Sequence, residues 1–230
     1  MRKKVTVAAT LALPARFRGG VTFRRRVVIL ALALALGVAL ALSSAGPAFA
    51  EVTKQTEHVM NQDGVGYYAE DAAHLTRQTN GISIRVSVPV PQPNDYTYPA
   101  GGVPTPSASP EVFTGWAFVF NYPDECANGP GECSGPDLFN PDVEAGVYNF
   151  AGHPTGAGGN LVLTGSIQVG QPAGGPPGST MAPLSNPEGA EVHMAIAPHG
   201  LIDPINMPAQ ANTPVGSPAC GCWWVAEFAP

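Results

Sequence analysis

The sequence predicts an all-β protein, a single antiparallel β-sandwich or flattened barrel with long loops rich in glycine and proline. Three observations predict this fold. Apolar residues alternate with polar ones at a period of two in short runs, and most of the 23 glycines and 23 prolines of residues 51–230 cluster between these runs. No segment of ten residues shows the period of an amphipathic helix. Strands that follow one another without intervening helices pair in antiparallel order.

The first part of the domain, residues 51–80, is polar and mixed, and we expect only an early strand and a short helical turn over residues 67–75. Residues 81–230 are expected to form the sandwich core. Its first strand is clear, because five β-branched residues alternate with mostly polar ones: Ile82, Ile84, Val86, Val88 and Val90. Residues 91–110 hold six prolines and predict a long irregular connection.

A central strand is predicted over residues 112–121. Trp116, Phe118 and Phe120 face one way, and the residues between them are also apolar, so both faces of this strand should be buried. An acidic loop with two cysteines follows over residues 122–145, and a Gly/Pro-rich connection covers residues 170–188. The remaining predicted strands are 147–150, 161–169, 190–197, which Pro198 ends, and 222–228.

Residues 1–50 have the pattern of a secretory signal peptide. Three arginines at 24–26 precede an apolar run over 27–42, and Ala-Phe-Ala at 48–50 supplies a cleavage site. The run is shorter than the roughly 20 residues that a membrane-spanning helix needs. We therefore expect cleavage before Glu51, export by the general secretory route rather than the twin-arginine route, and a secreted domain without membrane contact.

Residues 1–20 lengthen this leader without an evident purpose. We expect translation to begin at Val21, which gives a leader of ordinary length. Detection of peptides from residues 1–20 in the precursor would contradict that start.

The charge of the chain is uneven. Eight of its eleven basic residues precede residue 51, and only Lys54, Arg77 and Arg85 follow, together with all 17 acidic residues. Three basic and 17 acidic residues give the mature domain a net charge of −14. This excludes nucleic-acid binding, which needs several cations to displace counterions from phosphates, and an anionic membrane would repel the domain. Neutral glycans, cations and basic proteins remain as partners, and a merely solubilising acidic surface is the alternative.

Four cysteines in an exported domain predict two disulfides, with three connectivities. Cys126 and Cys133 bracket a six-residue loop that makes a local bridge easy. A bridge between Cys220 and Cys222 would close a tight ring. A crossed pairing that ties the loop to the C-terminal strand stays open, as does a Cys-x-Cys metal site.

Two clusters could bind metal ions. Glu191 and His193 share one face of a strand, and with His153 and His199 they predict a Zn or Cu site; local hydrogen bonds of each histidine are the alternative. Oxygen ligands on the acidic loop predict a Ca²⁺ site, although the same residue types also cap turns: Asp137, Asn140, Asp142 and Glu144.

Catalysis finds little support, and no catalytic residue is assigned. The chain has no Gly-x-Ser-x-Gly motif, and its cysteines should be oxidised. Carboxylate pairs such as Asp124 with Glu125, or Glu188 with Glu191, are expected by chance in so acidic a domain. Three tryptophans are candidate platforms for a sugar: Trp116, Trp223 and Trp224.

Several stretches together resemble a group of exported bacterial proteins of unassigned function. They are Val-Phe-Asn-Tyr-Pro-Asp-Glu-Cys at 119–126, Asp-Leu-Phe-Asn-Pro-Asp-Val at 137–143, Ala-Gly-His at 151–153, Gly-Ala-Glu-Val-His at 189–193 and Pro-His-Gly at 198–200. The strand with His193 is also similar to CHRD-type domains and to the β-sandwich of Cu/Zn superoxide dismutases, but it lacks a His-x-His pair. These resemblances imply a fold and no activity.

The sequence thus predicts a secreted, monomeric, disulfide-bonded β-sandwich that serves as a non-catalytic binding or envelope-associated module. A metal-binding domain or metalloenzyme is the first alternative, and a carbohydrate-binding or carbohydrate-active protein is the second. No cofactor is assigned.

Overall fold

The structure, a computed structural model, describes residues 52–61, 66–91, 111–155, 159–174, 181–212 and 224–230. All of them belong to one compact unit, Ala50–Pro230. The predicted leader, the connection over residues 92–110, and Cys220, Cys222 and Trp223 lie outside the described residues.

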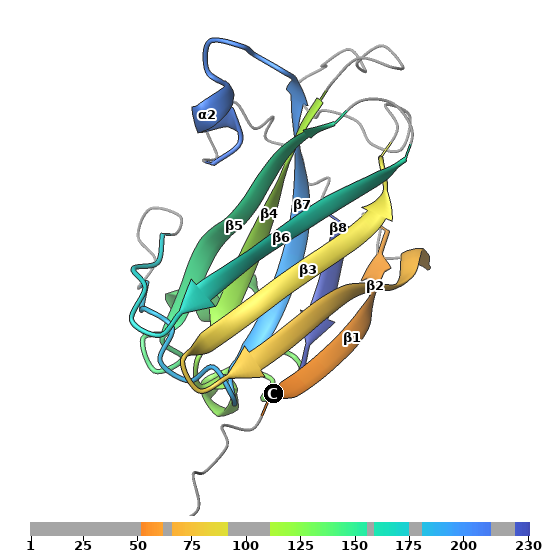
Figure 1. The fold of residues 1–230 in the computed structure, drawn as a ribbon. Helices are drawn as coiled ribbons and strands as arrows, with labels where there is room; N and C mark the ends of the chain where they lie inside the picture. The colour runs from red at the N-terminus through yellow and green to blue at the C-terminus, as the bar shows by residue number, and fades with distance from the viewer. Residues whose placement is uncertain (1–51, 62–65, 92–110, 156–158, 175–180, 213–223) are drawn as a thin grey trace, which may run out of the picture. The chain divides into compact units, whose positions relative to one another are not determined.

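Eight strands form one antiparallel sheet, as predicted (Figure 1). In chain order they are β1 (Thr53–Met60), β2 (Tyr67–Gln78), β3 (Gly81–Pro89), β4 (Glu111–Phe120), β5 (Ala145–Thr155), β6 (Asn160–Gln168), β7 (Glu191–Leu201) and β8 (Trp224–Phe228). Their order across the sheet is β5-β4-β7-β8-β1-β2-β3-β6. The sheet curls until its two outer strands, β5 and β6, lie side by side, so it approaches a flattened barrel.

The seam between β5 and β6 depends on a glycine. A Cβ atom on Gly165 of β6 would overlap the backbone carbonyl of Phe150 on β5. The register between β4 and β5 shifts beside Gly115, and the Phe150 ring lies over that glycine. The absence of two side chains therefore lets the strands approach closely enough to bring the sheet near closure.

The main core fills the inside of the curled sheet. The alternation predicted for β3 is confirmed, because Ile82, Ile84, Val86 and Val88 are buried while Ser83 and Arg85 are exposed. Both faces of β4 are apolar, also as predicted. Phe113, Ala117 and Val119 belong to the main core, and Trp116, Phe118 and Phe120 belong to a second, smaller cluster on the outer face.

The N-terminal part of the domain differs from the prediction. Residues 53–60 and 67–78 form two full strands of the sheet, and no helical turn lies in the described part of that segment. The register between β1 and β2 shifts near Glu57 and Val59, and Asp71 has a positive φ of 48°. Ala72 and Ala73 are consecutive yet both buried. This bulge interrupts the period of two that reveals a strand in the sequence.

Two further strand boundaries were predicted wrongly. Strand β7 continues past Pro198 to Leu201, because its register with β4 shifts next to the proline and accommodates a residue without an N–H group. Strand β5 extends over Gly152 and Pro154, which resemble loop residues in the sequence. Gly152 is needed there because the backbone of Ala211 approaches its Cα.

One buried cation closes the end of the barrel where β4 ends and β7 begins. Arg77 on β2 donates to the side-chain oxygen of Gln55 at 2.8 Å and to three carbonyl oxygens: Pro187 at 3.1 Å, Ala190 at 2.6 Å and Ala229 at 2.9 Å. Burial lowers the pKa of Arg77 to about 10, so the guanidinium is still charged at neutral pH. It joins the N-terminal strands to the segment before β7 and to the residue after β8.

The helical content of the described residues is small. It consists of the four-residue helix α2 (Met207–Gln210) and two 3-10 turns, η1 (Pro123–Glu125) and η2 (Gly135–Phe139). Within the described ranges, none of these helices has the length and apolar character needed to cross a membrane.

Candidate functional site

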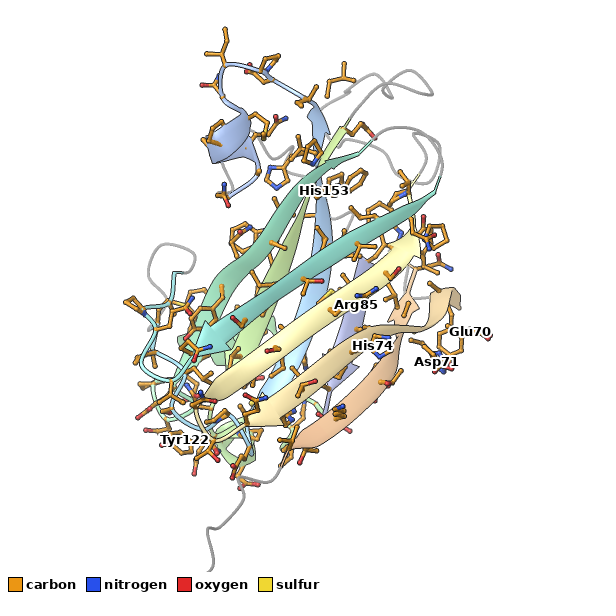
Figure 2. All side chains as sticks on the ribbon, viewed as in Figure 1. Glu70, Asp71, His74, Arg85, Tyr122 and His153 are labelled. Carbon is orange, nitrogen blue, oxygen red and sulfur yellow. A yellow bond between two sulfur atoms is a disulfide. The ribbon has the colours of Figure 1, made fainter. Side chains whose placement is uncertain are left out.

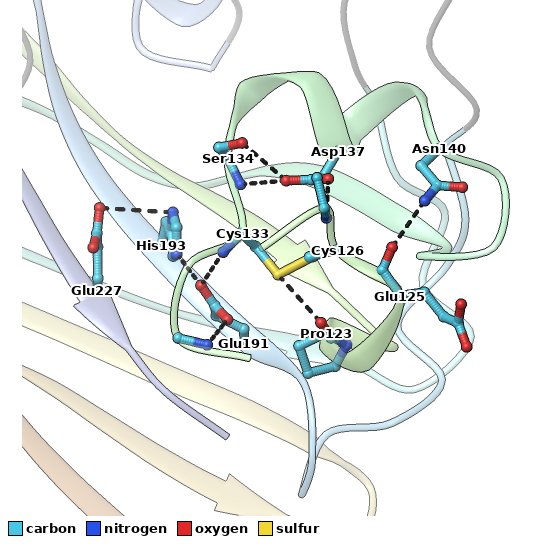
Figure 3. The surroundings of a disulfide bond; sticks show 12 residues. Pro123, Glu125, Cys126, Cys133, Ser134, Asp137, Asn140, Glu191, His193 and Glu227 are labelled. Atoms are coloured by element: carbon cyan, nitrogen blue, oxygen red, sulfur yellow. Dashed lines mark hydrogen bonds and ion pairs between the residues drawn. A yellow bond between two sulfur atoms is a disulfide. The ribbon is translucent and has the colours of Figure 1, made fainter. Parts of the chain in front are cut away.

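The candidate site is the acidic loop, defined here as residues 121–144 between β4 and β5. Cys126 and Cys133 form a disulfide inside it, with 5.3 Å between their Cα atoms, which is the local pairing among the predicted alternatives (Figure 3). The inner side of the loop packs on the outer face of the sheet and completes the second cluster: Phe120, Cys126, Cys133, Leu138, Val143, Ala145 and Val147. The loop therefore has its own small core.

Glu191 anchors this loop to the sheet. The residue begins β7 and is 1% exposed. Its carboxylate accepts hydrogen bonds from the Gly131 N–H at 2.5 Å, from the Cys133 N–H at 3.0 Å and from Nε2 of His193 at 2.6 Å (Figure 3). Bonds to an ionised acceptor are stronger than neutral ones, so the buried charge holds the disulfide turn against β7.

Asp137 fixes the loop from within. Its side chain accepts from the Ala127 N–H at 2.9 Å, and from the N–H and hydroxyl of Ser134 at 2.8 and 2.9 Å. Burial by itself would raise the pKa of Asp137, but these hydrogen bonds outweigh it and lower the pKa below the usual value. The Asp137 carboxylate therefore stabilises the conformation of the loop, and its role is structural.

Asn121 holds both ends of the loop and was not recognised in the sequence. Its amide nitrogen donates to the carbonyls of Glu144 at 2.5 Å and Pro183 at 3.1 Å. Its amide oxygen accepts from the N–H groups of Ser185 and Asn186. An asparagine at the end of a buried strand is the only signal, and it does not reveal partners more than 60 residues away in the 183–186 segment.

The outer side of the loop carries carboxylates that do not stabilise the fold through hydrogen bonds or ion pairs in the described residues. The loop has six acidic residues and no lysine or arginine. Four of them line an open surface pocket of about 500 Å³ together with Tyr122 and Pro141: Asp124, Glu125, Asp142 and Glu144. Tyr122 lies at the end of the barrel where β4 ends and β5 begins (Figure 2). No hydrogen bond or ion pair within the described ranges engages these four carboxylates.

The four residues predicted to bind Ca²⁺ do not share one site: two form hydrogen bonds within the loop, and two line the pocket. Asp137 is buried in its own hydrogen bonds, and the amide of Asn140 donates to the Glu125 carbonyl and accepts from the Asp142 N–H. Only Asp142 and Glu144 face the pocket. The turn-capping interpretation therefore describes Asp137 and Asn140.

The residues predicted to share a Zn or Cu site lie in three places. Glu191 and His193 are in contact. His199 is six residues further along β7, which places it roughly 20 Å from His193. His153 is exposed on β5 near the far end of the barrel (Figure 2). The four side chains do not form one site, and the described parts of the chain contain no group of three metal-binding side chains.

His199 belongs to a separate buried network at that far end. The Trp116 Nε1 donates to the Thr114 Oγ1 at 2.8 Å, and Thr114 lies 2.7 Å from the His199 Nε2. The threonine hydroxyl accepts from the indole and forms a second hydrogen bond with the histidine ring, whose direction depends on the ring tautomer. The Nδ1 atom is buried without a partner in the described residues. Gln210, the last residue of α2, donates to the His199 carbonyl at 3.1 Å.

This network predicts acid sensitivity of the fold. Burial lowers the pKa of His199 to about 4 from its ordinary 6.5, so between these values the unfolded chain binds more protons than the folded one. The free energy of unfolding should fall as the pH drops from 6.5 to 4, by up to about 3 kcal/mol from this residue. Urea unfolding at pH 7 and pH 4.5 measures the loss, which should be smaller in His199→Gln. An equal loss in both proteins would contradict the assignment.

The predicted sugar platforms differ in their availability. Trp224 is 1% exposed and packs against Tyr68 and Phe113, with ring centroids 5.5 and 6.5 Å apart. Its prediction as a platform was wrong, because it is a core residue of the barrel. Trp116 is half-buried on the outer face of β4, and Trp223 lies outside the described residues.

Fold and site define a class of protein: a β-barrel-like domain that presents a disulfide-braced acidic loop at one end. Comparison with family models, curated proteins and solved structures finds no match for this chain.

Proposed function

We propose that this protein is a secreted, non-catalytic binding module, and that its acidic loop recognises a basic partner. The observation that carries the proposal is that the carboxylates that hold the loop in place differ from those that it exposes. Glu191, Asp137 and Asn121 direct the inward hydrogen bonds and hold the backbone, whereas Asp124, Glu125, Asp142 and Glu144 project from the outer side without a partner in the described residues.

Preorganisation supports a binding role. A surface that is already ordered loses little conformational entropy when a partner binds. The disulfide, the buried Glu191 and the second apolar cluster order the loop before any partner arrives.

Two exposed aromatic side chains of the acidic loop suit a cationic partner. Tyr122 is 42% exposed and lines the acidic pocket, and Phe139 is 50% exposed on the same loop. A lysine or arginine side chain can contact a carboxylate and the face of an aromatic ring at once. The charge of −14 on residues 51–230 would also accelerate the approach of a basic protein at low salt.

A charge-matched pair of variants tests this proposal. The first variant, Asp124→Asn, Asp142→Asn and Glu144→Gln, neutralises the outer side of the loop. The second, Glu57→Gln, Glu70→Gln and Asp71→Asn, removes the same charge from β1 and β2. A fluorescent lysine-rich peptide is the probe, and its affinity for each protein is measured at 50 and 150 mM salt.

Specific recognition predicts that the first variant loses roughly tenfold in affinity while the second loses less than threefold. Binding of the unaltered protein should weaken as salt rises. An equal loss in both variants would show that the peptide senses only net charge, and absence of binding at 50 mM salt would contradict the proposal outright.

A further inference from the structure

His193 has one ring nitrogen engaged and one available. A carboxylate such as Glu191 only accepts hydrogen bonds, so the contact of 2.6 Å between Glu191 Oε1 and the Nε2 of His193 requires the proton to lie on Nε2. In the neutral ring the lone pair is then on Nδ1. Glu191 cannot rotate away, because the N–H groups of Gly131 and Cys133 hold its two oxygens.

Packing fixes the plane of the ring. The Phe120 ring meets the His193 ring edge-on at 5.1 Å between centroids. The side chain of His193 is 15% exposed, so the imidazole is neither buried in the core nor free in solvent. A ring that is oriented by a buried carboxylate and an aromatic edge presents Nδ1 in one direction.

The Nδ1 atom of His193 faces a second carboxylate, that of Glu227. Glu227 on β8 pairs with His193 across the two strands, and its Oε1 is 3.9 Å from Nδ1 (Figure 3). The Glu227 side chain is 61% exposed and can adjust its position. Two atoms bound to one zinc ion at about 2.0–2.2 Å each lie within about 4 Å of each other, so a small movement of Glu227 suffices.

We propose that Nδ1 of His193 and the carboxylate of Glu227 are two ligands of a divalent transition-metal site on the outer face of β7 and β8. Glu191 is not a ligand of this site. It accepts the other ring proton and orients the imidazole, as carboxylates behind metal-binding histidines do. Water completes the coordination, so the site resembles an open centre rather than a closed structural one. Imidazole and carboxylate ligands suit Zn²⁺ and Cu²⁺, with Cu²⁺ the tighter of the two.

The proposed metal site is separate from the acidic pocket that would bind a basic partner. His193 lies on the sheet under the disulfide turn, whereas the acidic pocket is lined by residues 122, 124, 125, 141, 142 and 144. Loss of metal binding and loss of peptide binding are therefore separate results from separate variants.

The test is titration of the protein with Zn²⁺, and separately with Cu²⁺, followed by calorimetry. His193→Gln should weaken binding at least tenfold, and Glu227→Gln about three- to tenfold. His153→Gln is the control, because it removes an exposed imidazole from β5, away from the site. The electron paramagnetic resonance spectrum of the Cu²⁺ complex should show one coordinated nitrogen that is lost in His193→Gln.

A loss of metal binding in His193→Gln must also be distinguished from a change in the fold. His193→Gln removes one partner of Glu191, so near-ultraviolet circular dichroism must show that it keeps the fold, whereas Glu227→Gln changes an exposed side chain only. Equal affinity of the unaltered protein and Glu227→Gln, a loss in His153→Gln as large as in His193→Gln, or no binding at 1 mM Zn²⁺ would each overturn the assignment.

Discussion

Replacement of Arg77 by methionine is expected to lower the free energy of unfolding by about 3–5 kcal/mol. Methionine preserves much of the apolar stem but leaves the carbonyls of Pro187, Ala190 and Ala229 without their donor at the closed end of the barrel. A buried acceptor that loses its partner retains the cost of its desolvation. In a domain of this size the melting temperature should fall by roughly 10 °C.

Arg85→Met is the control for this prediction. Arg85 is exposed on the neighbouring strand β3, so its loss should change stability by no more than about 0.5 kcal/mol. Urea unfolding of both variants measures the difference. Similar values for the two would show that Arg77 contributes only a surface charge. Hydrogen exchange adds a local readout, because the β8 amides near Ala229 should lose protection in Arg77→Met.

Replacement of Glu191 by alanine is expected to cost about 3 kcal/mol and to release the disulfide turn. The substitution leaves the N–H groups of Gly131 and Cys133 and the ring of His193 without their common acceptor. The disulfide stays within the loop, so the effect should be local. Hydrogen exchange should therefore show faster exchange at Gly131 and Cys133 than in the unaltered protein.

Glu227→Ala is the control for Glu191→Ala, because it removes one negative charge near His193 without removing hydrogen bonds to the disulfide turn. Glu227 is exposed beside the same histidine and makes no backbone contact of this kind in the described residues. Its loss should leave both amides protected and change stability by no more than about 0.5 kcal/mol. If the two amides remain protected in Glu191→Ala, another interaction holds the turn and the anchor described above is wrong.

The parts of the fold that could be predicted are those with local signals. The alternation in β3 and the double apolar face of β4 follow from neighbouring residues, and the Cys126–Cys133 bridge follows from a short spacing. Strand β2 was predicted only as an early strand with a short helical turn, because its bulge buries Ala72 and Ala73 in succession. A local pattern cannot reveal a strand where the structure itself departs from the pattern.

The roles of the buried charges could not be predicted, because their partners are distant in the chain. Glu191 meets backbone groups 58 and 60 residues earlier, and Arg77 meets carbonyls 110 to 152 residues later. The sequence indicated that Glu191 and His193 share a face, which is confirmed by their contact. The sequence could not show that both oxygens of Glu191 accept hydrogen bonds from the N–H groups of the loop. Because of these bonds, the carboxylate orients the His193 ring.

We propose that a preformed acidic loop is the binding surface of this protein. The most direct measurement maps where the lysine-rich peptide contacts an isotope-labelled protein, using chemical-shift changes in the backbone amides. The largest changes should fall between Tyr122 and Glu144, with β1 and β2 nearly unchanged. Changes spread evenly over the barrel, or centred on Glu57 and Glu70, would contradict it.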